Sequence, residues 1–166
     1  LSPAMIWKYV DDQEMKRREL RARWEKDYTL YLSKQGPVSD GYADYTTPAP
    51  MYFADKVMSL LTEAKLLIRF PVEVKDTNQR ASDDVKERFV LGALRAADAK
   101  LADLVLPALL PQLVFYITLR GSYGGRVILT QEPDGTTSIE IMPWDPMHTF
   151  YAVGSKGLAW ACYRMA

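Results

Sequence analysis

The fold is decided by residues 112–163, which read QLVFYITLRGSYGGRVILTQEPDGTTSIEIMPWDPMHTFYAVGSKGLAWACY. This stretch predicts the end of an apolar helix at 112–119 and a glycine loop at 121–125. It then predicts four strand-like runs, at 126–130, 136–142, 149–153 and 158–163. Glycine readily takes the left-handed conformation that closes a helix. We therefore expect the helix to lead through a tight loop into strands.

The hydrophobic period falls from about 3.6 residues before the glycine loop to 2 residues after it, as expected when helices give way to strands. Val127 and Leu129 alternate with their neighbours, and so do Ile139 and Ile141. The sequence PDG at 133–135 supplies hairpin chemistry, and the glycines of GSKG at 154–157 offer a second turn. We predict a small antiparallel β-meander.

The chain before this stretch predicts helices. A charged helix is expected at 11–32, a second helix at 51–70 that Pro71 stops, and a third that runs from Ser82 as N-cap to about 106. Pro107 and Pro111 then break the helix, and the apolar segment to 119 continues as a separate or kinked helix. One stripe of the first helix is expected to hold Met15, Leu20, Trp24, Tyr28 and Tyr31, and a wide apolar stripe of the second to hold Val57, Leu60, Leu61, Ala64, Leu67 and Ile68. The expected inward positions of the third helix are Val85, Phe89, Leu91, Leu94, Leu101 and Leu104.

The predicted fold class is therefore α+β, with three to four helices followed by a small antiparallel β-meander. We expect a charged N-terminal helix and loop arm at 1–46 and a helical plus β-meander domain at 47–166. The loop at 33–50 is an exposed arm or a linker, and residues 72–74 suit a short edge strand. The sequence starts at Leu1 and stops at Ala166 directly after a strand-like run, so we expect a fragment of a longer protein.

Composition excludes several classes of function. The chain has 166 residues, 21 basic and 21 acidic, and a formal net charge of zero, so it lacks the basic footprint of a duplex-binding domain. The single cysteine, Cys162, cannot form an internal disulfide, and one histidine with one cysteine excludes a Cys/His zinc site. The apolar run 104–119 is shorter than the roughly 18–20 residues of a membrane span, so we expect no membrane partner.

Two constellations invite a catalytic or nucleotide-binding interpretation. The 121–125 loop resembles a phosphate cradle, but phosphate loops follow a strand and open a helix, whereas here a helix ends and a strand begins. His148 lies near Asp145, with Ser155 and Cys162 further on, yet nothing in their spacing supports a nucleophile–base–orienter set. We favour a structural role for the loop and expect no catalytic residues and no cofactor.

Other candidate groups also favour structure. Asp83, Asp84 and Glu87 could ligate a metal, but carboxylates gather in the first turn of a helix for electrostatic reasons alone. The EF-hand pattern is absent, so no metal is expected. The aromatic set on the strands could stack on single-stranded bases, but too few basic residues accompany it for a backbone-tracking groove. Its members are Trp144, Phe150, Tyr151 and Trp160. A packed core is the favoured use.

Residues from about 45 to 165 resemble the amino-terminal part of tailed-bacteriophage portal proteins. Four motifs carry the resemblance in order: the lead TPAP at 47–50 before a helix and a longer acidic-start helix, the helix–loop–strand passage LRGSYGGRV at 119–127, the hairpin end IEIMPWDP at 139–146, and GLAW at 157–160. The charged opening helix, with Trp24, Tyr28 and Tyr31, is similar to the entry helix of such proteins. Positions expected to fix the chain path are Gly121, Gly124, Gly125, Pro143, Trp144, Pro146, Gly157 and Trp160.

The resemblance implies a structural virion protein without enzymatic activity. Portal proteins form a homo-oligomeric ring, usually of twelve subunits, at one capsid vertex, through which a terminase motor packages DNA and from which DNA is later ejected. Terminase, capsid and tail or connector proteins are the implied partners, and the virion, assembled in the host cytoplasm, is the implied location. This chain would correspond to the outer wing. The stem, clip and crown lie downstream in such proteins, so no DNA contact is assigned to this segment.

Two other functions stay open. One is a small enzyme or nucleotide-binding domain that uses the loop between Gly121 and Gly125 with Asp145 and His148. The other is a helical adaptor module that docks through the apolar stripe of the 51–70 helix.

Overall fold

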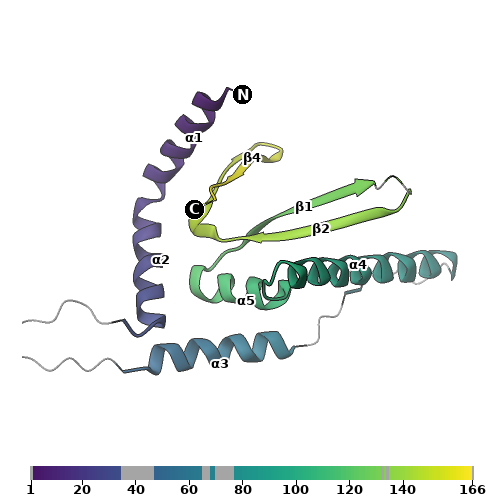
Figure 1. The fold of residues 1–166 in the computed structure, drawn as a ribbon, viewed down its shortest axis with the longest axis horizontal. Helices are drawn as coiled ribbons and strands as arrows, with labels where there is room; N and C mark the ends of the chain where they lie inside the picture. Colours follow the sequence, from purple (N-terminus) through teal and green to yellow (C-terminus); the bar gives the residue numbers. More distant parts are fainter. Residues whose placement is uncertain are drawn as a thin grey trace, which may run out of the picture. The chain divides into compact units, whose positions relative to one another are not determined.

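The computed structural model describes residues 2–34, 47–64, 68–69, 77–131, 133 and 135–165 (Figure 1). Five α-helices, one short 3-10 helix and four strands lie within this part of the chain, which confirms the predicted α+β class. The helices are α1 (Pro3–Lys16), α2 (Arg18–Tyr31), α3 (Ala49–Glu63), α4 (Thr77–Asp103), α5 (Leu109–Arg120) and the 3-10 helix η1 (Pro146–His148). The strands are β1 (Gly124–Gln131), β2 (Thr137–Trp144), β3 (Thr149–Gly154) and β4 (Gly157–Tyr163).

The predicted antiparallel strands form two separate two-stranded sheets, β1–β2 and β3–β4. The physical reason for the separation lies in the corner between β2 and β3. Pro146 occupies the first turn of η1 behind its N-cap Asp145, and this 3-10 turn takes the chain out of the first sheet. The second sheet pairs Phe150 with Cys162 and Tyr151 with Ala161, with an irregularity between Ala152 and Val153.

The chain divides into two compact units. Unit 1 contains Leu1–Leu61, Val114–Gly124 and Trp144–Ala166, and unit 2 contains Thr62–Leu113 and Gly125–Pro143. Both α5 and the β1–β2 hairpin contribute residues to both units. The predicted boundary between 46 and 47 borders residues 35–46, which lie outside the described residues, and it stays a prediction.

Unit 1 begins with two helices where one was predicted. Ser2 caps α1 by accepting a hydrogen bond from the backbone N–H of Met5 at 3.4 Å, and Pro3 follows at the first helical position. Arg17 then interrupts the helix with φ −104° and ψ 9°. Of the stripe predicted for one continuous helix, Trp24 is buried, but Met15 is 78% exposed. The two residues are nine positions, or two and a half turns, apart, so they lie on opposite sides even of an uninterrupted helix.

The core of unit 1 joins segments far apart in the sequence. Its buried apolar side chains are Val10, Trp24, Ala54, Val114, Leu119, Met147 and Phe150. Phe115 of α5 packs edge-on against Tyr28 and Tyr31 of α2. The Tyr31 hydroxyl donates to an Asp55 carboxylate oxygen at 3.0 Å, which links α2 to α3. Burial, and then this carboxylate, raise the pKa of Tyr31 above its ordinary value.

Much of the apolar stripe predicted for the second helix is exposed. Helix α3 ends at Glu63, so Ile68 lies beyond it, and Leu60 and Leu61 are 58% and 45% exposed. The one buried residue of α3 is Ala54, three residues before the half-buried Val57 and seven before Leu61, so the stripe is buried only at its N-terminal end. Residues 65–67 and 70–76, which include Leu67, Pro71 and the predicted edge strand at 72–74, lie outside the described residues.

Unit 2 consists of α4, the first turn of α5 and most of the β1–β2 hairpin, which lies alongside α4 (Figure 1). Its buried apolar residues are Ala97, Leu101 and Leu109. The Lys100 ammonium donates to the Ser138 hydroxyl at 2.7 Å, so the C-terminal half of α4 is bonded to β2. An Asp98 carboxylate oxygen accepts the backbone N–H of Leu109 at 2.8 Å and satisfies a donor at the start of α5.

Several predictions for α4 and α5 need correction. Helix α4 starts at Thr77, so Ser82 lies inside it rather than at its N-cap. Among the predicted inward positions Leu101 is buried, but Val85, Phe89 and Leu104 are exposed. Pro107 precedes a separate helix as predicted, whereas Pro111 does not break the helix. It sits in the first turn of α5, where the N–H that proline lacks would have no helical partner.

No helix among the described residues combines the length and the apolar character that a membrane span requires.

Gly125 provides a test of the hairpin geometry. A Cβ at this position would lie 2.9 Å from the carbonyl oxygen of Met142, whereas a Cβ at Gly124 would meet nothing nearer than 3.5 Å. Gly125→Ala should therefore lower the free energy of unfolding by about 1–3 kcal/mol, because the backbone of β2 must shift. Gly124→Ala, the matched control, should change it by less than about 1 kcal/mol. Chemical denaturation of both variants checks this, and equal effects would contradict the close approach.

Candidate functional site

The corner between β2 and β3 is built around Asp145. Its carboxylate accepts the backbone N–H of Met147 at 2.8 Å, and its carbonyl accepts the Thr149 hydroxyl at 2.8 Å. The backbone N–H of His148 donates to the same carbonyl at 3.0 Å. These are the bonds of an N-cap and a tight turn, so Asp145 is engaged in fixing the chain path.

Aromatic side chains pack around this corner. The ring of Trp144 stacks on Tyr163 at 5.3 Å between centroids, and the ring of His148 meets Tyr163 edge-on at 6.4 Å. The ring centroid of Trp160 on β4 lies 5.8 Å from that of Tyr9 on α1. These contacts are typical of aromatic packing. They join the corner to β4, and β4 to the opening helix.

Arg120, which the sequence did not single out, is the buried charge of the site. It is 9% exposed, it donates to the backbone carbonyl of Trp24 at 2.7 Å, and its guanidinium lies 5.3 Å from the centre of the Tyr28 ring. Its Nε lies 3.9 Å from Asp145 Oδ1, and this nitrogen has no hydrogen-bond partner among the described residues. A positive charge at the C-terminal end of a helix is favoured by the helix dipole. This was the only local feature of the sequence that pointed to Arg120.

Tyr116 lies one turn before Arg120 on α5, and its pKa reflects the same environment. Burial raises the pKa of Tyr116 above its ordinary value, the negative charge of Asp145 raises it further, and Arg120 opposes the rise. The phenol therefore stays neutral over a wider pH range than usual. Its behaviour agrees with a packed environment beside a buried ion pair.

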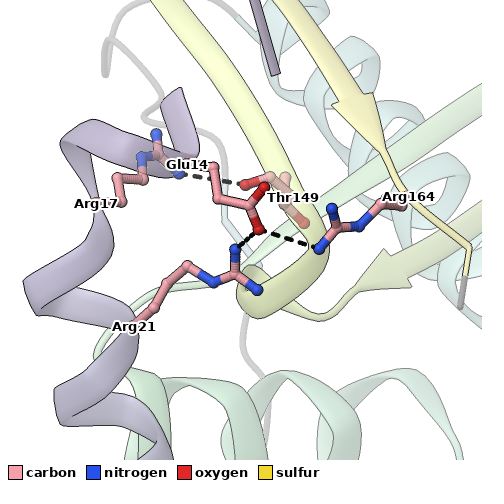
Figure 2. Close-up of polar contacts among 5 residues, drawn as sticks. All are labelled: Glu14, Arg17, Arg21, Thr149 and Arg164. Atoms are coloured by element: carbon pink, nitrogen blue, oxygen red, sulfur yellow. Dashed lines mark hydrogen bonds and ion pairs between the residues drawn. The ribbon is translucent and has the colours of Figure 1, made fainter. Parts of the chain in front are cut away.

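A second polar cluster joins the two opening helices to β3 and the end of β4 (Figure 2). The Glu14 carboxylate accepts hydrogen bonds from Arg21 and from Arg164, the latter at 3.2 Å. Arg17 donates to the carbonyl of Thr149 at 3.2 Å, and its guanidinium lies 4.0 Å from the centre of the Tyr151 ring. The hydrogen bond from Arg21 holds the pKa of Glu14 below its usual value, although partial desolvation opposes this. We call Glu14, Arg17, Arg21 and Arg164 the arginine anchor.

The glycines of the site are placed at turns and close approaches. Gly121 follows α5 with φ +65°, and its N–H bonds to the carbonyl of Ile117 at 2.9 Å, as in a residue that ends a helix. Gly125 lies against the backbone at Met142 and Pro143, and Gly157 opens β4 with φ +108°. A Cβ placed on Gly124 would meet the Thr149 side chain at an ordinary contact distance of 3.5 Å. The 121–125 loop therefore leads out of a helix into β1.

The catalytic hypothesis finds little geometric support. Asp145 and His148 share backbone contacts, but the structure shows no hydrogen bond between their side chains among the described residues. The Nδ1 atom of His148 is buried and has no hydrogen-bond partner in the part of the chain that the structure describes. Cys162 is half-buried on β4, and Ser155 is exposed in the turn after β3. The structure therefore does not bring these side chains together in a nucleophile–base arrangement.

The described residues contain no group of three or more His, Cys, Asp or Glu side chains that could hold a metal ion. Asp84 is exposed and Glu87 is half-buried on α4, whereas the side chain of Asp83 lies outside the described part.

Comparison of the chain with known protein families, with curated proteins and with solved structures found no match. The charged groups described above bond chiefly to one another and to backbone atoms, and in doing so they join α1, α2 and α5 to the corner and to the second sheet. This arrangement is typical of a protein region with a structural role.

Removing the buried charge should be costly. Arg120→Met removes the side-chain donor to the carbonyl of Trp24, which keeps its helical partner, and leaves Asp145 without its nearby cation, so we expect a loss of about 1–3 kcal/mol in the free energy of unfolding. The control is Arg126→Met, because Arg126 pairs with Glu140 while 47% exposed. That variant should lose at most about 1 kcal/mol. Urea denaturation of both compares them, and similar losses would show that Arg120 is not an anchoring charge.

Glu14 should make the arginine anchor sensitive to acid. A folded-state pKa below the unfolded value stabilises the fold above the unfolded value, and this contribution disappears as the pH falls through the lowered pKa. Glu14→Gln should therefore be less stable than wild type at pH 7, by about 0.5 kcal/mol because the cluster is partly exposed. The difference should be smaller at pH 3 than at pH 7.

Denaturation of wild type and Glu14→Gln at both pH values measures this effect directly. The control is Asp12→Asn, because Asp12 pairs with Lys16 at 2.6 Å in an exposed position on α1. A difference between wild type and Glu14→Gln that stayed constant with pH would contradict the ion-pair origin.

Proposed function

We propose that this chain is part of the outer wing of a tailed-bacteriophage portal protein, a structural component of the ring at the capsid vertex. The observation that carries the proposal is the ordered resemblance of the motifs from 47 to 160, from TPAP to GLAW. The structure contains elements in a compatible order: α3, α4 and α5, then the glycine loop, β1 and β2, the corner, and β3 and β4.

The internal contacts support a structural role. Several of the motif residues lie at turns or close approaches of the backbone. Gly121 ends α5, Gly125 makes a close approach in the first hairpin, and Pro146 starts the turn that Asp145 caps. A wing domain has to hold a fixed shape within a ring, and such positions serve that purpose.

Exposed apolar side chains support assembly. In unit 1, Tyr52 and Phe53 are 65% and 74% exposed, and in unit 2, Val127 and Leu129 are 65% and 64% exposed. Large exposed apolar residues that cluster along an element mark surfaces that other protein covers. In a ring, neighbouring subunits and capsid proteins would provide that cover.

The remaining properties follow from the same proposal. The full-length protein forms a homo-oligomeric ring of twelve subunits, which terminase, capsid and tail or connector proteins contact. DNA is packaged and ejected through the ring, and this segment is assigned no contact with DNA, no cofactor and no catalysis. The protein resides in the virion after assembly in the host cytoplasm.

The proposal is tested by the oligomeric state of the protein expressed from its complete reading frame, with whatever sequence flanks these residues. Mass photometry and negative-stain electron microscopy should show closed rings of about twelve subunits. A protein that stays monomeric at tens of micromolar would contradict the proposal. Added nucleotides at millimolar concentration should leave the melting temperature unchanged. A clear rise would instead favour the nucleotide-binding alternative at the 121–125 loop.

A further inference from the structure

Helix α4 carries an apolar stripe on a side where nothing of unit 2 packs among the described residues. Val85 and Phe89 are 64% and 60% exposed, and Gly92, Ala96 and Ala99 are exposed as well. These positions follow one another at intervals of four, three, four and three residues, so they share one side of the helix. We call these five residues the α4 stripe.

The contacts of α4 within unit 2 lie on other sides of the helix. Among its described side chains Ala97 and Leu101 are buried, Lys100 bonds to Ser138 of β2, and Asp98 bonds to the first N–H of α5. A Cβ placed on Gly92 would meet no atom of the described residues within 4 Å. The α4 stripe is therefore a second apolar surface of the helix, separate from the one that packs on the hairpin.

The pattern of the α4 stripe fits another helix. Alternating intervals of three and four residues are the spacing of a coiled-coil seam, in which each apolar side chain enters a gap on the facing helix. Gly92, Ala96 and Ala99 have little or no side chain, so a facing helix with larger apolar residues can approach closely there. Val85 and Phe89 supply bulk at the other end.

The charged residues along the borders of the α4 stripe determine which kind of helix can bind there. Arg88 and Arg95 stand one heptad apart along one border of the α4 stripe, both are exposed, and neither has a polar partner among the described residues. Lys86 lies on the opposite border. Facing a second α4 would bring basic borders together in either direction, and such like-charge pairs are unfavourable. The stripe therefore disfavours its own copy and favours acidic borders.

We propose that the α4 stripe binds an amphipathic helix of a partner protein, whose apolar seam is bordered by glutamate or aspartate. The apolar side chains of that helix would pack on Phe89 and over the small residues, and its carboxylates would pair with Arg88 and Arg95. The binding of such a helix depends on the surface of α4 alone and does not depend on the portal proposal.

The test uses two synthetic helical peptides of about three heptads, with leucine along the seam and either glutamate or lysine at all border positions. Like charges keep each peptide from pairing with itself. Fluorescence anisotropy should show that the whole protein binds the glutamate peptide about tenfold more tightly than the lysine peptide. Arg88→Glu with Arg95→Glu should reverse this preference. Binding of neither peptide, or equal binding of both, would overturn the proposal.

Phe89→Glu supplies the control for the apolar part of the contact. It should abolish binding of both peptides, and because Phe89 is largely exposed the melting temperature should stay within a few degrees of wild type. Analytical ultracentrifugation of wild type and Phe89→Glu then tests a second copy as the occupant. Self-association that Phe89→Glu removes would overturn the proposal, whereas an unchanged oligomeric state in the two proteins agrees with it.

Discussion

The buried guanidinium of Arg120 is the constraint on which the architecture of unit 1 depends. A charge at 9% exposure is tolerated only where polar partners surround it, and here the partners come from distant segments. The carbonyl of Trp24 lies 96 residues earlier in the chain, and Asp145 belongs to the corner after β2. Helix α2, the end of α5 and the corner must therefore meet at one point, and a fold without that meeting would leave the guanidinium unpaired.

The arginine anchor acts at the surface of the same unit and has a smaller energetic role. Glu14 has a side-chain exposure of 36%, so solvent screens its bonds to Arg21 and Arg164. Its contribution is geometric. Arg17 stands at the interruption between α1 and α2, and from there it reaches both the carbonyl of Thr149 and the face of Tyr151. The bend between the helices and the position of β3 are thereby fixed together.

Local signals made the second half of the chain predictable. Glycine, proline and period-2 alternation act over a few residues, and all four strands lie within about two residues of their predicted bounds. The faces of the helices were not predictable in this way, because a stripe such as Val85 and Phe89 becomes core only where another element covers it. Proline also misled the prediction at Pro111, where its position in the first turn removes its effect.

The site was predictable only in part, for a related reason. The sequence PWDP marked the corner, since a capping Asp before proline is a local pattern. Arg120 and Glu14 were missed because their partners lie far away: Arg164 is 150 residues from Glu14. No local pattern distinguishes an arginine that will be buried from one that stays in water. Such residues become visible only when the chain is folded.

The distribution of burial links the fold to assembly. The large side chains that are fully buried among the described residues are Phe150 and Leu101, one in each unit. Each unit also relies on a two-stranded sheet, which is marginal without further packing. A partner that binds only the folded form stabilises such a unit by mass action. On the portal proposal this cover comes from neighbouring subunits, and at the α4 stripe it comes from an acidic helix. In both cases the exposed apolar surface serves the assembled state, while the buried charges hold each unit in the shape that assembly requires.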